Sequence, residues 1–377
     1  MRKEMQLTRH PPLWQRVVWL VGLLFLFLVA IKLLESGIKV FGEGAAGNLF
    51  EGIQNPFAAL AAGILATVLV QSSSVSTATI VALVGSGAIG VEAAVPMVMG
   101  ANIGTTITNT LVSMGSIRRS ADFQRALSAA TVHDFFNLMA VAIFLPLQIA
   151  TGFFSNAARH IAAALPVGTG PGGFQSPIKS AVKDVAGWFK HGVQDWLGLE
   201  GGFAGVALLI LGLGLIFFSL TTITRTMRAI IADKAERALN AALRRSGWIA
   251  IAIGVVITIS VQSSSITTSL LVPLCASGVL TLENAFPVML GANIGTTITA
   301  FLASMATDIN GLQIAIVHGL FNLVGVGLVY PIRAVRRIPI RIASSFSAVA
   351  VRNKFWVVFY VLTVFILIPL CGILIFG

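Results

Sequence analysis

Residues 68–79 read VLVQSSSVSTAT, and residues 259–270 read ISVQSSSITTSL. Each stretch places a glutamine and a run of hydroxyl side chains in the middle of an apolar region. Helices that cross a membrane avoid such clusters, because every polar group needs a partner inside the bilayer. A single run of this kind is explained by packing, since small hydroxyl side chains let helices approach closely. Its duplication favours a binding site instead.

The composition indicates a membrane environment. The chain has 377 residues, of which 56% are hydrophobic and only 10% charged, and its mean hydropathy is +0.91. A soluble protein of this length carries about 25% charged residues. The apolar runs at 13–34 and 355–376 are long enough to cross a bilayer, which takes roughly 20 residues. No small-residue cleavage site follows the first run, so we expect it to be a retained span.

The net charge of +11 does not indicate a nucleic-acid partner. Lysine and arginine gather in a few short segments between apolar runs, as the positive-inside rule requires of cytoplasmic loops. The sequence therefore predicts a multi-pass protein of the plasma membrane, or of the inner membrane in a bacterium, with a cytoplasmic N-terminus. Its partner is the lipid bilayer, and the oligomeric state stays open.

The chain contains an internal repeat. Gln71 and Gln262 lie 191 positions apart (262 − 71), and PMVMGANIGTTIT (96–108) returns at the same offset as PVMLGANIGTTIT (287–299). Ten of these thirteen residues are identical. VHDFFNL (132–138) returns as VHGLFNL (317–323), now 185 positions later (317 − 132). This period is far longer than that of solenoid repeats, so it indicates two large halves.

The predicted fold class is an all-α polytopic membrane protein that forms a single transmembrane domain over residues 1–377. Repeat 1 is expected at about 13–150, a linker at 151–200, repeat 2 at about 202–332 and an extra span at about 353–376. Other spans are predicted at 13–36, 91–114, 125–150, 202–223, 282–305 and 311–332. Within the linker, VGTGPGG (167–173) breaks the chain, and apolar residues at helical spacing over 178–196 predict an amphipathic helix on the membrane surface.

Loop charges predict that the two repeats have inverted topology. The loop expected at 35–52 is mostly acidic, whereas its counterpart at 223–246 is strongly basic. The next pair reverses this bias, because RRSADFQR (118–125) is basic and ATDING (306–311) has no positive residue. Equivalent loops with opposite bias lie on opposite sides of a membrane. Each repeat therefore crosses an odd number of times, as three spans and one re-entrant hairpin would.

The re-entrant segment is expected to be the one that carries QSSS. Two helical arms, at 56–70 and 75–89, would meet at a tip near the middle of the membrane. The second arm would begin at Ser72–Ser74 with free backbone N–H groups and the positive end of a helix dipole, which attract anions. Inversion would bring two such tips together across a central pocket, where inverted-repeat transporters bind substrate.

The GANIGTT motif predicts a cation site. Its glycines would allow local unwinding, and its carbonyl and hydroxyl oxygens suit a hard cation. No cluster of ligands indicates a transition metal. Asp134 is the carboxylate singled out within the apolar spans, and its counterpart is Gly319. Structural explanations stay open: Asp134 could pair with a neighbour, and the asparagines of GANIGTT could cap broken helices. His133 and His318 are interpreted as hydrogen-bond partners between helices.

Together, the paired QSSS runs, GANIGTT, VHDFFN and the tail IRIASSFSAVAVRNKFWVVFYVLTVFILIPL (340–370) resemble the type II sodium-dependent phosphate cotransporters. The resemblance implies electrogenic uptake of inorganic phosphate coupled to sodium, by alternating access, with no enzymatic activity and no cofactor besides the coupling ions. The implied phosphate-binding residues are Gln71, Ser72, Ser73, Ser74, Gln262, Ser263, Ser264 and Ser265. The implied sodium ligands are Gln71, Asn102, Thr105, Thr106, Asp134, Asn137, Gln262, Asn293, Thr296, Thr297 and Asn322.

Asp134 matches an acidic residue that goes with electrogenic transport and an additional sodium ion in that family. The chain departs from animal members because residues 151–200 contain no cysteine, and its short form suggests a prokaryotic member. A single span after the repeats would place the C-terminus opposite the N-terminus.

Other functions stay open. The same hairpins could serve a sodium-independent anion channel, which sodium-free phosphate flux would reveal, or a transporter of another oxyanion. An intramembrane serine hydrolase would need a base near a hydroxyl, for which His133 is the candidate.

Overall fold

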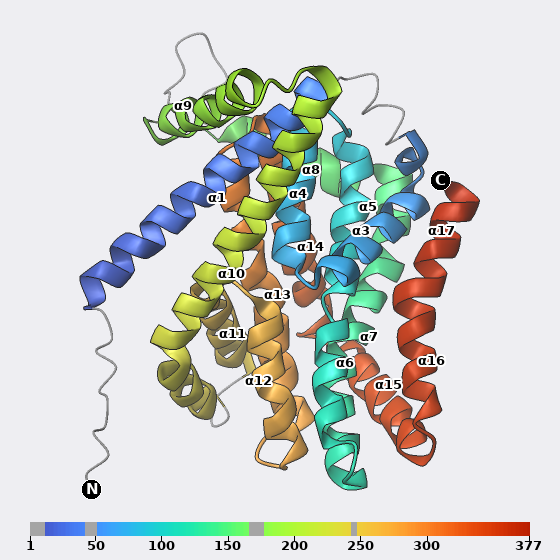
Figure 1. Cartoon of the computed structure of the whole chain (residues 1–377). Coiled ribbons are helices and arrows are strands. Elements are labelled where there is room, and N and C mark those ends of the chain that lie inside the picture. Colours follow the sequence, from blue (N-terminus) through green and yellow to red (C-terminus); the bar gives the residue numbers. More distant parts are fainter. Residues whose placement is uncertain (1–11, 42–50, 166–176, 243–246) are drawn as a thin grey trace, which may run out of the picture.

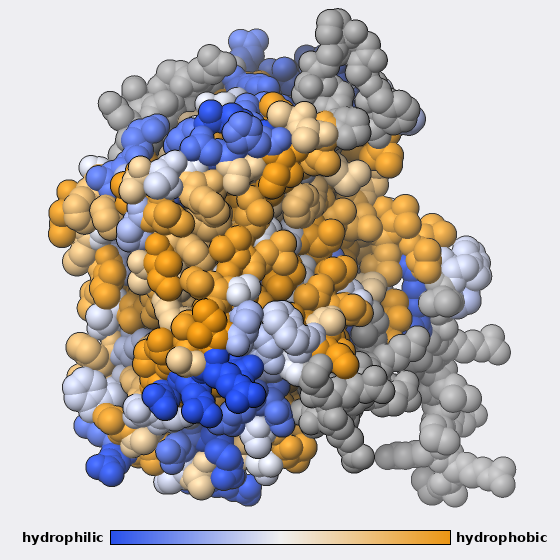
Figure 2. All heavy atoms as spheres, turned by 180° about the vertical axis from the view of Figure 1, so that it is seen from behind, coloured by the Kyte–Doolittle hydropathy of each residue, from blue (hydrophilic) through white to orange (hydrophobic). Residues whose placement is uncertain are grey.

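The computed structural model describes residues 12–41, 51–165, 177–242 and 247–377, and this part of the chain contains helices and no strands. Six of its helices are long and apolar enough to cross a membrane. On the face shown in Figure 2, apolar side chains cover the middle of the molecule and hydrophilic side chains gather at its upper and lower ends. The prediction of an all-helical polytopic membrane protein is confirmed.

The first half of the chain forms a long helix, a broken pair, a kinked helix and a second long helix (Figure 1). These elements are α1 (Leu13–Phe41), η1 (Glu51–Gln54), α3 (Pro56–Val70), α4 (Ser73–Ser86), α5 (Val91–Gly104), α6 (Ile107–Ser113), η2 (Met114–Ser116), α7 (Ser120–Thr151) and α8 (Phe153–Ala164). The predicted arms of the first hairpin are α3 and α4. Figure 1 shows α3 running from the upper end into the interior and α4 running back toward that end.

The second half repeats this order of elements. It contains α9 (Pro177–His191), the π-turn η3 (Gly192–Trp196), α10 (Gly201–Ala242), α11 (Gly247–Val261), α12 (Ser264–Ala276), α13 (Leu282–Ser304), α14 (Ile309–Val329), α15 (Arg333–Arg352), α16 (Phe355–Leu362), the π-turn η4 (Thr363–Leu367) and α17 (Ile368–Phe376). In Figure 1, α12 ends at the lower end of the bundle, opposite the end where α4 finishes.

Glycines of the two repeats make equivalent close contacts. A Cβ atom on Gly100 of α5 would overlap the carbonyl oxygen of Leu60 in α3. The residues 191 positions later do the same, because a Cβ atom on Gly291 of α13 would overlap the carbonyl oxygen of Ile251 in α11. Small residues let membrane helices pack backbone to backbone. The first arm of each hairpin is therefore held directly against the GANIGTT helix of its own repeat.

Helix boundaries differ from the sequence predictions in three places. The span predicted at 91–114 is broken after Gly104, where Thr105 and Thr106 form a turn between α5 and α6. The matching helix α13 is continuous, so the predicted unwinding of the second GANIGTT is wrong. Helices α1 and α10 also continue into the predicted loops at 35–52 and 223–246.

Continuation of α1 turns a predicted loop carboxylate into a buried one. Glu35 is only 4% exposed, and its carboxylate binds the ammonium groups of Lys32 and Lys39 at 2.7 and 2.8 Å. A buried carboxylate is tolerated in an apolar helix when cations pair with it.

Some segments used in the sequence predictions lie outside the described residues. They contain the basic residues Arg2, Lys3, Arg9, Arg244 and Arg245 and the breaker at 167–173.

Helices α8, α9, α15, α16 and α17 lie outside the residue ranges of the two repeats. Helix α9 occupies the segment where the spacing of apolar residues predicts a helix, and it lies across the upper end of the bundle (Figure 1). Lys179 at its start donates a hydrogen bond of 2.8 Å to the carbonyl oxygen of Thr307, which follows α13. Helices α8 and α15 were not predicted from the sequence. Figure 1 shows α17 ending at the upper right of the bundle, whereas α1 begins at about mid-height on the left.

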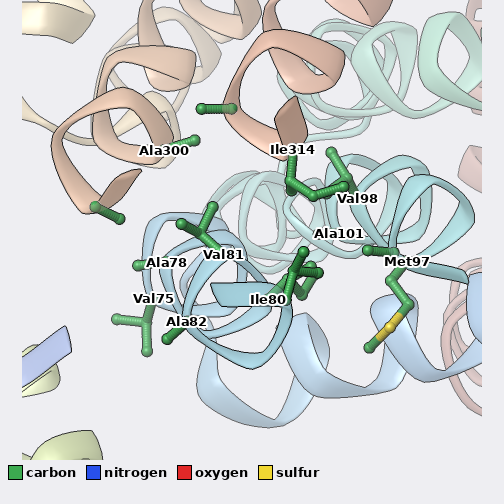
Figure 3. Close-up of a cluster of buried hydrophobic side chains, with 14 of the residues drawn as sticks. Val75, Ala78, Ile80, Val81, Ala82, Met97, Val98, Ala101, Ala300 and Ile314 are labelled. Carbon is green, nitrogen blue, oxygen red and sulfur yellow. The ribbon is translucent and has the colours of Figure 1, made fainter. Parts of the chain in front are cut away.

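The second arm of the first hairpin packs between the repeats. Figure 3 shows Val75, Ala78 and Val81 of α4 in one apolar cluster with Ala300 of α13 and Ile314 of α14. Because α4 is covered by helices of both halves, its polar N-terminus is fixed in the interior of the bundle.

Candidate functional site

Each QSSS run marks a break between two helices. Gln71 ends α3 and Gln262 ends α11, both with a φ of 56°, and they are the only non-glycine residues with positive φ among those described. Side chains other than glycine adopt this left-handed conformation at a cost of roughly 1–2 kcal/mol. The same strained break at two positions 191 residues apart is a feature that packing alone does not require.

The serine after each glutamine caps the next helix. The hydroxyl oxygen of Ser72 accepts a hydrogen bond of 3.3 Å from the backbone N–H of Val75, and Ser263 accepts an equivalent bond of 3.3 Å from Ile266. Serine is a favoured N-cap because it satisfies an amide at the helix start. Helices α4 and α12 consequently begin inside the protein, each with the positive end of its dipole at a cluster of hydroxyls.

The two glutamine side chains are oriented in the same way. The Gln71 amide donates to the Val68 carbonyl at 2.6 Å, and its oxygen accepts from the Thr108 hydroxyl at 3.3 Å. In the second repeat, Gln262 donates to Ile259 at 2.7 Å and accepts from Thr299 at 3.2 Å. Thr108 and Thr299 each end a copy of GANIGTTIT, so this motif fixes the glutamine at each tip.

The tips of the two hairpins touch each other. The Ser74 hydroxyl lies 3.5 Å from the Gln262 carbonyl oxygen and 3.4 Å from the Thr299 hydroxyl. A second contact between the repeats joins α6 to α12. The Asn109 side-chain oxygen accepts hydrogen bonds from Thr268 at 2.9 Å and from Ser269 at 3.2 Å. Residues far apart in the sequence therefore form one polar cluster, in which Ser73, Ser74 and Ser264 are buried.

Both hairpins and the GANIGTT helices that follow them lack basic side chains. The sequence contains no lysine or arginine between residues 51 and 117 or between residues 246 and 332. An anion held at the tips would therefore depend on backbone N–H groups, helix dipoles and hydroxyls.

A chain of buried amides connects the repeats beside this cluster. The Asn137 side chain of α7 donates to the Asn102 carbonyl oxygen at 2.9 Å, and Asn293 of α13 donates to the Asn137 side-chain oxygen at 2.7 Å. The His133 Nε2 atom lies 2.6 Å from the Asn293 side-chain oxygen. The interpretation of His133 as a hydrogen-bond partner between helices is confirmed. The same interpretation is wrong for His318, which has no hydrogen-bond partner on either ring nitrogen within the described structure.

Asp134 is fully buried in α7 next to this chain of amides. Its Oδ2 atom accepts a hydrogen bond of 3.1 Å from the Tyr360 hydroxyl of α16. The hydroxyls of Thr106 and Thr110 lie next to the carboxylate, but within the described residues neither meets the distance and angle of a hydrogen bond to its Oδ1 atom. The Thr106 hydroxyl instead donates to the Ile103 carbonyl oxygen at 2.8 Å. The Thr110 hydroxyl also lacks a partner in the described structure. An unpaired carboxylate oxygen and an unpaired hydroxyl in a dry environment are suited to a cation.

The matching position in repeat 2 is filled differently. Gly319 corresponds to Asp134, and a Cβ atom there would lie 3.5 Å from the ring of Phe301. Phe301 in turn corresponds to Thr110 at the 191-residue offset (301 − 110). An aspartate and a threonine in one repeat are thus replaced by a glycine and a phenylalanine in the other. The two repeats therefore differ chemically at the position of Asp134.

Four further predicted sodium ligands make hydrogen bonds within their own helices or have no partner among the described residues. The hydroxyls of Thr105 and Thr297 bond carbonyl oxygens of their own helices at 2.9 and 2.7 Å, and the buried Thr296 hydroxyl has no described partner. Asn322 donates to the His318 carbonyl oxygen at 3.1 Å, and its side-chain oxygen is unpaired within the described residues.

A cleft of about 480 Å³ lies at the far end of α4, between Glu92, Arg159 and Asn310, and no QSSS residue lines it.

Comparison with known proteins identifies the family. The model of the Na+/Pi-cotransporter family matches residues 26–166 and 215–351, and each matched segment contains one QSSS run. The chain belongs to the Na+/Pi-cotransporter family. No solved structure matches it.

Its curated relatives include sodium-dependent phosphate transport protein 2B of Homo sapiens, which is 32% identical over 444 residues. Sodium-dependent phosphate transport protein 2A of Ovis aries is 30% identical over 426 residues. Both alignments cover 94% of this chain, which spans 64% and 66% of the two relatives.

Sequence reasoning missed several residues that complete the polar cluster of this Na+/Pi-cotransporter homologue. Thr108 binds Gln71 at the first tip, whereas Thr299 and the pair Asn109 and Thr268 join the two repeats. Tyr360 joins the C-terminal span to Asp134. Thr108 and Thr299 carried a signal in the sequence, because they lie inside the repeated GANIGTTIT. Tyr360 lies outside the matched segments and has no counterpart in the first repeat.

Proposed function

We propose that this protein is a secondary transporter that couples sodium influx to the uptake of inorganic phosphate. The relatives are sodium-dependent phosphate transport proteins by name, and the chain shares their family. The observation that carries the proposal is the contact between two QSSS tips, each of which presents a helix N-terminus and hydroxyls in the interior of the bundle. Such a site suits a phosphate dianion without a basic side chain.

Uptake of labelled phosphate into proteoliposomes tests this function. We expect uptake under an inward sodium gradient and little uptake when choline replaces sodium. Equal uptake in both conditions would identify the alternative, a sodium-independent anion channel. Competition by other oxyanions in the same assay defines the substrate class.

The proposed architecture consists of two inverted repeats, each with one re-entrant hairpin. Support comes from the matched breaks at Gln71 and Gln262, the matched glycine contacts and the opposite ends toward which α4 and α12 run. In this arrangement the N-terminus is cytoplasmic, and the basic ends of α7 and α10 face the cytoplasm with it. Transport would proceed by alternating access, as one part of the bundle moves against the other.

Labelling of matched cysteines tests the inversion. Gly90 and Thr281 are 191 positions apart (281 − 90), are both exposed and precede α5 and α13. In a background without Cys275 and Cys371, we expect a membrane-impermeant maleimide to label Gly90→Cys from outside intact cells. Thr281→Cys should react only in inside-out vesicles. Labelling of both from the same side would rule out inverted repeats.

We also propose that sodium and phosphate bind cooperatively at the tips. Sodium near the tips lowers the electrostatic cost of placing a dianion in a medium of low dielectric constant. Phosphate affinity should therefore rise by about 5- to 150-fold with saturating sodium, and sodium affinity should rise equally with phosphate. Isothermal titration calorimetry of the purified protein measures both constants. Equal phosphate affinity in sodium and in choline would contradict this coupling.

A further inference from the structure

The C-terminal span contributes a side chain to the carboxylate that distinguishes the two repeats. Tyr360 belongs to α16, beyond the residues that the family model matches, and it is one of only two tyrosines in the chain. Its hydroxyl donates a hydrogen bond of 3.1 Å to the Oδ2 atom of Asp134, 226 residues earlier. Repeat symmetry does not account for this contact, because the span has no counterpart in the first half.

Aromatic side chains hold the ring of Tyr360 in place. Its centroid lies 4.9 Å from that of Phe346 in α15, 5.8 Å from that of Phe135 in α7 and 5.9 Å from that of Phe365 in η4. Edge and tilted contacts of this kind are favourable and directional. Three elements therefore fix the direction of the tyrosine hydroxyl, and α7 supplies both the carboxylate and one of the rings that clamp its donor.

The hydrogen bond fixes which carboxylate oxygen is available. Since Oδ2 accepts from Tyr360, rotation of the carboxylate would break a partly buried hydrogen bond. The Oδ1 atom stays without a described donor beside the unpaired Thr110 hydroxyl. Groups that orient a ligand oxygen in this way tune cation affinity without touching the cation.

We propose that Tyr360 is a positioning residue for a sodium ion bound at Asp134, so that the C-terminal span is a functional part of the ion site. This inference rests on the proposed sodium-coupled function. The Tyr360 hydroxyl donates to Oδ2 of Asp134, so that Oδ1 and the Thr110 hydroxyl face the ion. Loss of the hydroxyl leaves the charge of Asp134 in place but frees the carboxylate to rotate, which weakens sodium binding without removing the site.

The test compares Tyr360→Phe with Tyr330→Phe, the matched change at the other tyrosine. Tyr330 packs against Trp248 with centroids 4.9 Å apart, so its ring also has an aromatic contact. For Tyr360→Phe we expect the sodium concentration for half-maximal uptake to rise about three- to tenfold. Phosphate affinity at saturating sodium should change less than twofold. Sodium binding without phosphate, measured by calorimetry, should weaken by the same factor, and Tyr330→Phe should match the parent protein in every measurement.

Two outcomes would overturn the proposal. Unchanged sodium dependence and sodium binding in Tyr360→Phe would show that the hydroxyl positions nothing. Equal losses of sodium and phosphate affinity in Tyr360→Phe would assign the residue a general structural role. Failure of the proposed function is distinguishable from both, because the parent protein would then show no sodium-driven uptake at all.

Discussion

Replacement of Ser264 by leucine is expected to abolish sodium-driven phosphate uptake while the helix bundle stays folded. Ser264 is the first residue of α12, directly after the cap at Ser263, and it is 2% exposed. A leucine there would occupy the space at the helix N-terminus that we assign to phosphate. Because the anion would be held by backbone N–H groups and small hydroxyls, bulk should be more damaging than the loss of one hydroxyl.

Two further variants separate binding from folding. Ser264→Ala keeps the backbone amide and removes one donor to a charged ligand, which contributes about 1.5 kcal/mol or more. We expect it to fold normally and to weaken phosphate affinity by about tenfold. Ser277→Leu places the same bulk at the exposed far end of the hairpin and should transport normally. Thermal unfolding and size-exclusion chromatography identify any variant that is misfolded. Normal uptake by Ser264→Leu would refute the pocket.

The hairpins were predictable from the sequence because their signals are local. A glutamine followed by three serines interrupts an apolar run, and the predicted arm at 56–70 coincides with α3. The capping serines and the left-handed glutamines need only a few neighbouring residues to form. Duplication of the motif favoured the interpretation of each break as part of a binding site. The ligands of that site belong to the proposed function.

Features that depend on tertiary contacts could not be predicted from the sequence. The two copies of GANIGTTIT are identical, yet the chain breaks at Thr105 and Thr106 and stays helical at Thr296 and Thr297. Local propensity is equal in both, so the packing of neighbouring helices decides the backbone. The contact of Tyr360 with Asp134 likewise joins a repeat to a span outside it, and no sequence period predicts such a pair.

The pairing of Asp134 with Thr110 gives the asymmetry of the repeats a physical meaning. In repeat 2 the equivalent residues are Gly319 and Phe301. The phenyl ring of Phe301 therefore lies where repeat 1 has a carboxylate and a hydroxyl. One divalent phosphate balances two sodium ions, and a third ion makes the transport cycle carry net positive charge inward. We propose that this third ion binds at Asp134 and that transport is therefore electrogenic.

Asp134→Gly is expected to convert the protein to electroneutral cotransport. Without the carboxylate the third ion loses its counter-charge, so the charge moved per phosphate should fall from about one to about zero. The sodium Hill coefficient should fall as well. In the parent protein, an inside-negative potential of 100 mV favours the inward movement of one charge by about 2.3 kcal/mol, and this dependence should disappear. Current and labelled phosphate uptake, recorded on the same proteoliposomes, give the ratio directly.

Two companion variants distinguish the loss of an ion site from a loss of packing. Asp134→Asn keeps the size of the side chain and an acceptor for Tyr360, so it should fold like the parent protein and still lose the charge movement. The double variant Thr110→Phe with Asp134→Gly copies the pair found in repeat 2, where the ring fills the space. If Asp134 is only structural, the surviving protein in each preparation will keep the parent ratio of charge to phosphate. An unchanged ratio in Asp134→Asn would therefore refute the sodium site, whereas a ratio near zero in all three variants would establish that this carboxylate binds the charge-carrying ion.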